Sequence, residues 1–440
     1  MGPLAKRIVP WPTALMVDRL HQRIESRRDE LVELTRALIA FPTINPPGEA
    51  YEPCARAIGA RLARGGYQVR YVRAEGTPGD SDRYPRINVV ARHEGRRPGP
   101  TVHFNGHIDV VEVGKGWTVD PFAGTVRDGR VYGRGACDMK GGLAAAIVAA
   151  ECLIAERPDH AGAIEISGTV DEESGGFGGV AHLARMGLLA KPRVDHVIIP
   201  EPLNVDRVCL GYRGVWWAEI ETHGSIAHGS MPFLGDCAVR HMGAVIDRFE
   251  RELWPALADR RTAMPVVPDG AAAATLNVNA IHGGGVEHHD GLPSPNVPHS
   301  CRMTIDRRFL IEESLDDVRN EVMGLLDSLA GERAGFAYSI RDLMTVHPTM
   351  TDENADVVRA LDGAIRHVLG REPAHVASPG TYDQKHIARL GHLHDCVAYG
   401  PGILELAHRP DEFVVIDDLV ASAKVMASAL DALLNGPGTG

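Results

Sequence analysis

The chain has 440 residues, 44% hydrophobic and 24% charged, a composition typical of folded globular proteins and not of disordered ones. Its 46 basic and 58 acidic residues give a net charge of −12 at pH 7, and a net anion binds nucleic acid and anionic membranes poorly. No apolar run approaches the ~20 residues that span a bilayer. We therefore expect neither nucleic acid nor a membrane as a partner.

The cysteines and the N-terminal residues both bear on the cellular compartment. Residues 1–20 mix Lys6, Arg7, prolines and Asp18, and they lack the continuous apolar core of a secretory signal. Seven cysteines are scattered without a Cys-x-x-Cys pair, so neither a disulfide scaffold nor a zinc ribbon is indicated. We expect a reducing cytoplasm.

The first half of the chain alternates helical and strand patterns. Apolar periodicity predicts helices at 17–41, 51–65, 141–155 and 180–189. Strand patterns lie at 68–73, 87–92, 101–104, 163–170 and 194–199. This alternation indicates an α/β sheet covered by helices on both faces. Ligands of such sheets gather at the carboxyl ends of the strands.

The pattern changes near residue 215. Strands are expected at 215–222, 275–281, 300–309 and 336–340, with helices at 237–257 and 315–329. That order is β-α-β-β-α-β, a ferredoxin-like unit. Helical and α/β patterning returns after Asn354. We therefore expect one unit at 1–214 and 347–440, with residues 215–346 inserted into it as a second unit.

Five short blocks carry residues suited to chemistry. Taken singly, each also fits an ordinary loop, a helix N-cap or a solvated acidic turn. Most of them follow predicted strands, so their side chains are expected to gather at one sheet edge. The blocks are His107-Ile108-Asp109, Asp138 within the glycine-rich 133–142, Asp171-Glu172-Glu173, Glu201 between two prolines, and His408 in 399–412.

Together these blocks favour a metal site. Like charges as close as Asp171, Glu172 and Glu173 repel one another, and a cation relieves that repulsion. Sets of imidazole and carboxylate ligands suit a pair of zinc-like divalent ions. Two such ions can share a water and lower its pKa toward neutrality.

The order of the blocks and the residues within them resemble the M20 family of metallopeptidases and amidohydrolases, and the resemblance extends from about Leu31 to Leu434. The resemblance implies a zinc-peptidase-like α/β catalytic domain with an inserted ferredoxin-like lid that makes a homodimer. It also implies two divalent ions per chain, Zn²⁺ or alternatively Co²⁺, and a cis peptide bond after Asp138.

The resemblance also implies residue roles in the catalytic domain. His107 and Glu201 would hold one ion, Glu173 and His408 the other, and Asp138 both. Asp109 would orient His107, and Glu172 would act as general acid and base.

Further roles fall on the lid and on the last motif. His228 would reach the partner subunit's active site and stabilise an oxyanion, while Arg213, Asn296, Arg308, Thr381 and Lys385 would contact substrate. The motif at 378–385 departs from the family pattern, because Pro379 replaces a glycine and Lys385 stands near an arginine position. Lysine keeps the charge but loses the bidentate fork, so recognition of a substrate α-carboxylate is altered here.

The expected function is a dinuclear zinc amidohydrolase that removes an acyl group from a small, carboxylate-bearing amide. A dipeptidase or carboxypeptidase with the same metals is an alternative, as is a deformylase or decarbamoylase of a heterocyclic amine, because Lys385 and Tyr382 alter the pocket. A catalytically inactive binding protein would lack a ligand or Glu172, and none is missing.

Overall fold

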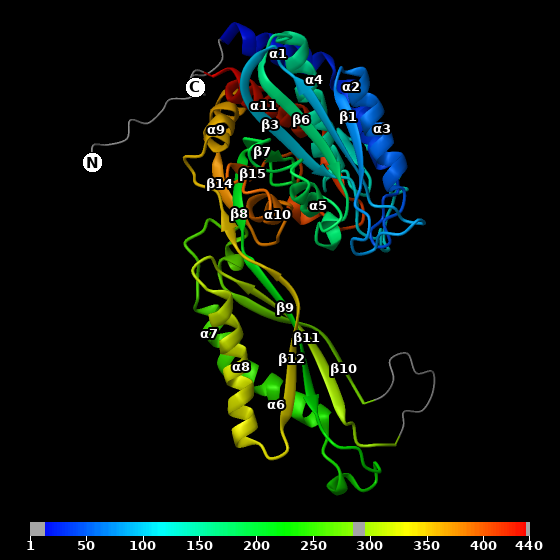
Figure 1. The fold of residues 1–440 in the computed structure, drawn as a ribbon, viewed down its shortest axis with the longest axis vertical. Helices are drawn as coiled ribbons and strands as arrows, with labels where there is room; N and C mark the ends of the chain where they lie inside the picture. Colours follow the sequence, from blue (N-terminus) through cyan, green and yellow to red (C-terminus); the bar gives the residue numbers. More distant parts are fainter. Residues whose placement is uncertain (1–13, 285–294, 437–440) are drawn as a thin grey trace, which may run out of the picture. The chain divides into compact units, whose positions relative to one another are not determined.

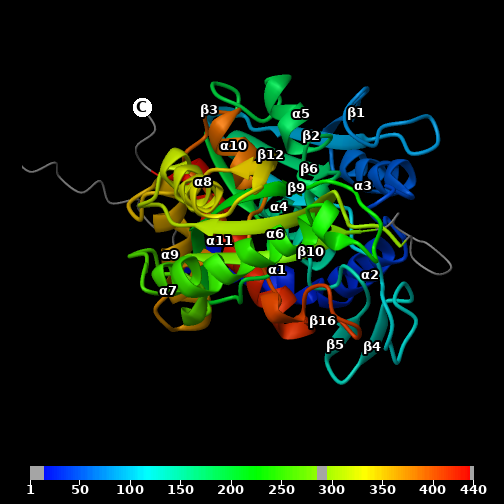
Figure 2. The same ribbon diagram turned by 90° about the horizontal axis from the view of Figure 1, so that it is seen from below.

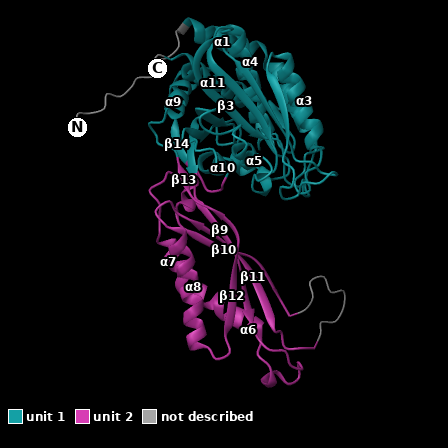
Figure 3. Cartoon of the chain, in the orientation of Figure 1, with its two compact units in different colours: residues 1–211, 351–376, 382–440 teal, residues 212–350, 377–381 magenta. Residues whose placement is uncertain are grey.

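The computed structural model describes residues 14–284 and 295–436. Residues 1–13 and 437–440 of the expected catalytic unit, and residues 285–294 of the expected insertion, lie outside this described part. The chain forms two compact units (Figure 3). The first comprises Met1–Gly211, Thr351–Val376 and Tyr382–Gly440, and the second Tyr212–Met350 and Ala377–Thr381. The sequence-based division placed 377–381 in the first unit. The structure places it in the second, where Ala377 pairs with Val266 in a β-bridge.

Seven strands of the main sheet run in the order β1-β2-β6-β3-β7-β15-β8, and the sheet continues from β8 to β13 and β14. Figure 1 labels most of these strands. Neighbours β6, β3, β7 and β15 are parallel, so their carboxyl ends meet at one edge. Strand β2 pairs antiparallel with both β1 and β6. The strands are β1 (Gln68–Arg73), β2 (Ile87–Glu94), β3 (Arg97–His107), β6 (Ala161–Thr169), β7 (His196–Ile199), β8 (Arg207–Tyr212) and β15 (Cys396–Ala398).

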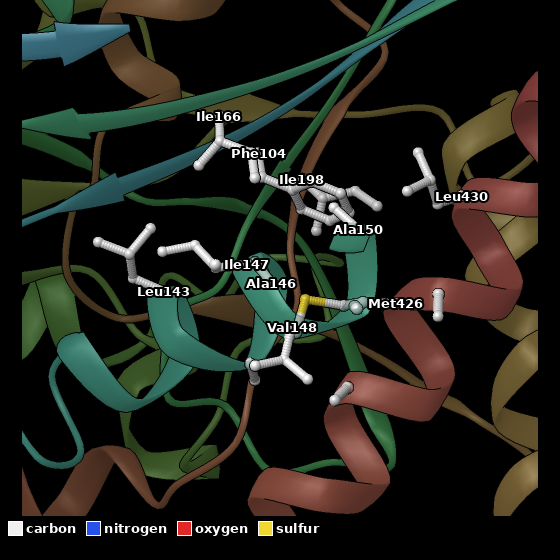
Figure 4. Packing of buried hydrophobic residues seen from close by; sticks show 14 of the residues in the cluster. Phe104, Leu143, Ala146, Ile147, Val148, Ala150, Ile166, Ile198, Met426 and Leu430 are labelled. Carbon is white, nitrogen blue, oxygen red and sulfur yellow. The ribbon is translucent and has the colours of Figure 1, made fainter. Parts of the chain in front are cut away.

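Helices α4 (Lys140–Glu156) and α11 (Ile416–Asn435) pack together and against this sheet, and they build the largest core (Figure 4). Ala146, Ile147 and Ala150 of α4 are fully buried. Small alanine side chains allow the helix to approach the strands closely, where it meets Phe104 of β3. Because α4 is buried over most of its length, its sequence is apolar on all sides.

The remaining elements of the first unit surround this core. A separate small sheet has the order β16-β5-β4 (Figure 2). The helix expected at 17–41 is divided at Arg27, whose backbone (φ −104°, ψ 16°) leaves the helical region. The elements are α1 (Ala14–Ser26), α2 (Arg28–Ile39), α3 (Tyr51–Arg64), α5 (Val180–Arg185), α9 (Asp356–Leu369), α10 (Gln384–Arg389), β4 (Thr125–Arg127), β5 (Arg130–Tyr132) and β16 (Phe413–Val415). Strands β13 (Thr349–Met350) and β14 (Ala374–Ser378) lie where the chain passes between units.

The second unit has the β-α-β-β-α-β order that the sequence predicts. Its strands run β10-β11-β9-β12, and all neighbours are antiparallel. The expected helix at 237–257 is interrupted by a π-helical turn at Phe249–Leu253, before Pro255, which lacks a backbone N–H. The elements are β9 (Gly214–His223), α6 (Ala238–Arg248), α7 (Trp254–Ala258), β10 (Thr275–Gly283), β11 (Ser300–Phe309), α8 (Leu315–Glu332) and β12 (Ala337–Val346).

Within the described ranges, no helix combines the length and the apolar character that crossing a membrane requires.

The packing of α4 yields a test of the fold. A Cβ atom added to Gly142 would lie 1.9 Å from the carbonyl oxygen of Pro200, the residue before Glu201. We expect Gly142→Ala to destabilise the protein by about 1–3 kcal/mol, because overpacking outweighs the helix propensity that alanine adds. The measurement is the midpoint of thermal unfolding. Gly243→Ala on α6, where a Cβ meets nothing within 4 Å, is the control and leaves the midpoint unchanged or raises it. Equal midpoints for the two variants would contradict this packing.

Candidate metal centre and active site

The carboxyl edge of the main sheet collects the first unit's predicted site residues. His107 is the last residue of β3, Glu172 and Glu173 follow β6 in a 3₁₀ turn (Glu172–Ser174), and Glu201 follows β7. Asp138 precedes α4, across a cis peptide bond to Met139, as the resemblance implies. His408 follows the 3₁₀ turn Leu404–Leu406. Parallel strands β6, β3 and β7 therefore bring distant sequence blocks together.

Asp138 lies between two sets of donor atoms. Its Oδ1 is 3.1 Å from His107 Nε2, which is 3.8 Å from Glu201 Oε1. Its Oδ2 is 3.5 Å from His408 Nε2, which is 3.1 Å from Glu173 Oε2. Ligand atoms of His107, Asp138 and Glu173 all lie within 4.8 Å of one another. Two imidazoles and three carboxylates, with one carboxylate facing both sides, fit two neighbouring divalent cations.

The tautomer of His107 is fixed by the loop that follows it. Its Nδ1 lies 3.0 Å from the backbone carbonyl of Asp109, to which it donates, so Nε2 is left as a ligand atom. The Asp109 carboxylate lies farther from Nδ1, at 3.6 Å. That carboxylate accepts instead from the backbone N–H groups of Glu172 and Glu173, at 3.2 and 3.0 Å, and from Asn45. Asp109 thus fixes the acidic turn as well as the His107 loop.

The electrostatics of the cluster show a deficit of positive charge. Burial raises the pKa of Glu173 to about 7 and that of Glu201 well above its usual range, and nearby Asp138 adds to both shifts. Burial also opposes ionisation of Asp138, but hydrogen bonds from His107 and His408 outweigh it and lower that pKa. Hydrogen bonds to Asp138 and Glu173 raise the pKa of His408 to about 10. A neighbouring metal cation would favour the ionised form of these buried carboxylates.

Glu172 faces a lysine. Lys385 Nζ lies 2.8 Å from Glu172 Oε1, and both side chains are largely buried. Burial opposes the charge of Lys385, but Glu172 and Asp383 outweigh it and raise the pKa, so the ammonium is kept. Sequence reasoning assigned Lys385 to substrate, whereas its described contact is with Glu172.

Asp171 belongs to a different environment from its two acidic neighbours. Its carboxylate accepts from Tyr51 Oη at 3.0 Å and from Arg86 Nε at 3.2 Å. Burial, followed by the charge of Asp109, raises its pKa to about 6. Asp171 therefore anchors the turn in the core and contributes no ligand atom to the cluster around Asp138.

Sequence reasoning missed a buried ion pair that shapes the Asp138 loop. Glu412 Oε1 accepts from the backbone N–H groups of Gly135, Cys137 and Asp138, at 3.0, 2.8 and 3.1 Å. Its Oε2 lies 2.6 Å from Arg134 Nη1, and Arg134 Nη2 donates to the His408 carbonyl at 3.2 Å. Both residues stand within the quoted blocks, but a single sequence does not show that they pair.

The other predicted site residues belong to the second unit. His228 is exposed, its Nδ1 accepts from Ser230, and its backbone bridges to Asn296. Arg308 pairs with Asp306 through two bonds of 2.7 and 2.9 Å. Buried Arg213 donates to the Ala273 carbonyl at 2.8 Å. Burial, followed by the charge of Arg308, lowers the Arg213 pKa to about 10. Thr381 ends the short segment 377–381.

Because the Arg134–Glu412 ion pair is buried, a conservative substitution of Glu412 should lower the stability of the protein strongly. We expect Glu412→Gln to cost about 3–5 kcal/mol in unfolding free energy, because it leaves the Arg134 guanidinium buried without its counter-charge. It also weakens metal binding, because the three N–H groups that fix the Asp138 loop lose a charged acceptor. Chemical denaturation and metal analysis measure the two effects. Glu405→Gln, at an exposed position in the same loop region, is the control. A Glu412→Gln protein as stable as this control would contradict the account.

Comparison with known proteins identifies the family of this chain. The model of peptidase family M20/M25/M40 matches residues 103–432. The chain is 30% identical over 411 residues to a succinyl-diaminopimelate desuccinylase of Stenotrophomonas maltophilia, covering 92% of this chain and 99% of that protein. Two solved structures share the fold at 20% identity: human carnosine dipeptidase 1 (TM-score 0.76, covering 97% and 100% of the two chains) and an M20 metallo-carboxypeptidase of Sulfolobus solfataricus (TM-score 0.72, 92% and 99%). The chain therefore belongs to peptidase family M20/M25/M40 and is a metal-dependent hydrolase of amide bonds.

Proposed function

We propose that this protein is a dinuclear, metal-dependent deacylase that hydrolyses the amide bond of a small N-acylated substrate bearing a carboxylate. The observation that carries the proposal is the Asp138 carboxylate, whose two oxygens face two separate imidazole–carboxylate sets. The similarity to a succinyl-diaminopimelate desuccinylase over 92% of the chain supports an N-acyl substrate with a carboxylate.

We assign five ligands to two ions. His107 and Glu201 would hold one ion, Glu173 and His408 would hold the other, and Asp138 would be a ligand of both. Mixed imidazole and carboxylate ligands favour Zn²⁺, with Co²⁺ as the second candidate. When bound, the two ions supply Lewis acidity, which lowers the pKa of a water and polarises the amide carbonyl.

Glu172 performs the proton transfers. Its Oε1 is bound by Lys385, and we assign the transfers to Oε2. The carboxylate takes a proton from the attacking water, a bond forms from that water's oxygen to the amide carbon, and a tetrahedral species results. As the C–N bond breaks, Glu172 returns the proton to the leaving amine. Lys385 keeps the carboxylate oriented between the two transfers.

The second unit supplies the remaining contacts. Arg308, Asn296, Arg213 and Thr381 recognise the substrate, with the guanidinium groups suited to its carboxylate. His228, from the partner subunit, stabilises the oxyanion.

A homodimer through the second unit is supported by exposed apolar side chains near His228. Ile226, Phe233 and Leu234 are 60, 79 and 66% exposed. Apolar groups gathered on a surface are characteristic of association sites.

Lys385 and Tyr382 also bear on the alternative of a heterocyclic amine as substrate. That alternative depended on Lys385 and Tyr382 altering the pocket. Lys385 contacts Glu172, and Tyr382 is buried, with its hydroxyl 3.4 Å from the Cys209 carbonyl.

A dipeptidase is the second candidate, because the shared fold includes a carnosine dipeptidase. None of the seven cysteines forms a disulfide, which supports a cytoplasmic location.

A substrate screen tests the function. Zinc-loaded protein is assayed against N-succinyl, N-acetyl, N-formyl and N-carbamoyl amino acids and against dipeptides. The proposal predicts the highest kcat/KM for an N-acyl amino acid, and preferential cleavage of dipeptides would establish the second candidate instead.

Glu172 and Glu173 are adjacent in the sequence, but we expect substitution of the first to lower the rate and substitution of the second to lower the metal content. We expect Glu172→Gln to keep two metal ions and to lose about two to four orders of magnitude in kcat, the usual size of a general acid–base contribution. Glu173→Gln loses one ion first, because its Oε2 faces His408. Metal analysis and a rate assay on the identified substrate distinguish them. Metal loss in Glu172→Gln with retention in Glu173→Gln would reverse the assignment.

Lys385 has two alternative roles that kinetics separate. If it orients Glu172, Lys385→Met lowers kcat by about tenfold or more with little change in KM, and Lys385→Arg recovers part of the rate. If it binds substrate, KM rises at unchanged kcat. Lys424→Met, which removes an ion pair with Glu25 on the surface, is the control.

The assembly prediction concerns His228. Mixing Glu172→Gln chains with His228→Ala chains should restore activity above that of either parent, because one site of each mixed dimer keeps both groups. Mixed dimers are verified by mass spectrometry of differently tagged chains. Verified mixed dimers with background activity would show that His228 does not act across the interface.

A further inference from the structure

A second group of potential metal ligands lies elsewhere in the first unit. His196, Asp356 and Asp395 each offer a ligand atom, and these atoms lie within 4.8 Å of one another. His196 begins β7, Asp356 begins α9, and Asp395 immediately precedes β15. Backbone pairing explains the meeting, since β7 and β15 are parallel with Val197 opposite Cys396, so the preceding residues are neighbours.

The contacts within this group are short and specific. His196 Nδ1 lies 2.6 Å from Asp395 Oδ2, and Asp395 Oδ1 accepts from the backbone N–H of Val357 at 3.1 Å. That second bond draws the first turn of α9, and with it Asp356, against the imidazole. The side chain of His196 is only 8% exposed.

The group is separate from the Asp138 cluster. Strand β7 begins at His196, while Glu201 lies beyond its other end at Ile199. At about 3.3 Å per residue, the strand alone separates its two ends by about 10 Å. The group therefore occupies the edge of the sheet opposite the carboxyl ends that hold the catalytic residues.

A cavity of about 640 Å³ opens onto this group. Lys191, Asp195, His392 and His394 also line it. Lys191 forms an ion pair with Asp195 at 2.8 Å, and Arg359 contacts Asp356. The side chains of Asp195, Asp356 and Asp395 carry three negative charges, and Lys191 and Arg359 carry two positive charges. The group therefore has a net negative charge when its imidazoles are neutral. The cavity therefore has room and charge for one cation.

Capping of α9 does not account for the whole group. The positive end of a helix attracts carboxylates, which explains Asp356 and Asp395. It does not attract a histidine, and yet the buried imidazole of His196 packs there, with two more imidazoles lining the cavity. One imidazole with two carboxylates, and further imidazoles within the same cavity, is a donor set for zinc-like cations and not for Mg²⁺ or Ca²⁺.

We propose that His196, Asp356 and Asp395 bind a third divalent cation of the Zn²⁺ or Co²⁺ class. His394, His392 or water completes the coordination. The ion ties the starts of β7, α9 and β15 together, and it plays no part in the hydrolysis. The proposal is independent of the proposed function, because it concerns other residues at the opposite sheet edge.

The experiment is metal binding in a background without the catalytic cluster. In Asp138→Ala protein, equilibrium dialysis against Zn²⁺ and absorption spectra with Co²⁺ report the remaining sites. One ion per chain should remain bound, and adding Asp356→Asn or His196→Asn should reduce this by at least tenfold in affinity. Asp352→Asn, an exposed aspartate just before α9, is the matched control. Thermal unfolding with and without Zn²⁺ gives a second readout, and the midpoint shift disappears with the site.

Every result of this experiment either supports the third cation site or overturns it. Retained binding in Asp138→Ala that is lost in Asp356→Asn but kept in Asp352→Asn supports the site. Absence of binding in Asp138→Ala, or binding unaffected by Asp356→Asn, overturns it and leaves the group as a helix cap. Asp356 is half-exposed, so its variant keeps the test valid even if His196→Asn does not fold.

Discussion

Three carboxylates that share one buried sheet edge set the main constraint on this structure. Asp138, Glu173 and Glu201 converge with the imidazoles of His107 and His408. Burial and the charge of Asp138 raise the pKa values of Glu173 and Glu201, and hydrogen bonds to Asp138 and Glu173 raise the pKa of His408. Burying these carboxylates together costs free energy when no metal is bound, whereas divalent cations stabilise the same arrangement. The electrostatics of the site therefore agree with membership of a family of metal-dependent amide hydrolases.

The surrounding structure serves mainly to hold these charges in place. Asp109 accepts from the backbone of the acidic turn, and Glu412 accepts from the backbone of the Asp138 loop. Arg134 connects that loop to the His408 carbonyl. Such shells of charged hydrogen bonds orient the ligands. They also explain how loops far apart in sequence keep the two sides of Asp138 distinct. Lys385 plays the corresponding part for Glu172.

Much of this could be predicted from one sequence. The blocks around His107, Asp138, Glu173 and Glu201 are adjacent to strong strand and helix patterns, so their gathering at one sheet edge follows from α/β topology. The ferredoxin-like order of the second unit follows from its alternating strands. Pairings between distant side chains could not be predicted, because Glu412 lies in a loop and Lys385 in the first turn of the short helix α10, and their partners depend on tertiary packing. The break at Arg27 and the short strands β4, β5 and β16 have too few residues to give a periodic signal.

The central claim is that Asp138 lies between two cations. Crystals of zinc-loaded protein, measured with X-rays just above and just below the zinc absorption edge, test it most directly. The account predicts two anomalous peaks on opposite sides of the Asp138 carboxylate, one beside His107 and Glu201 and the other beside His408 and Glu173. A single peak beside Asp138, or zinc bound away from these five residues, would contradict it.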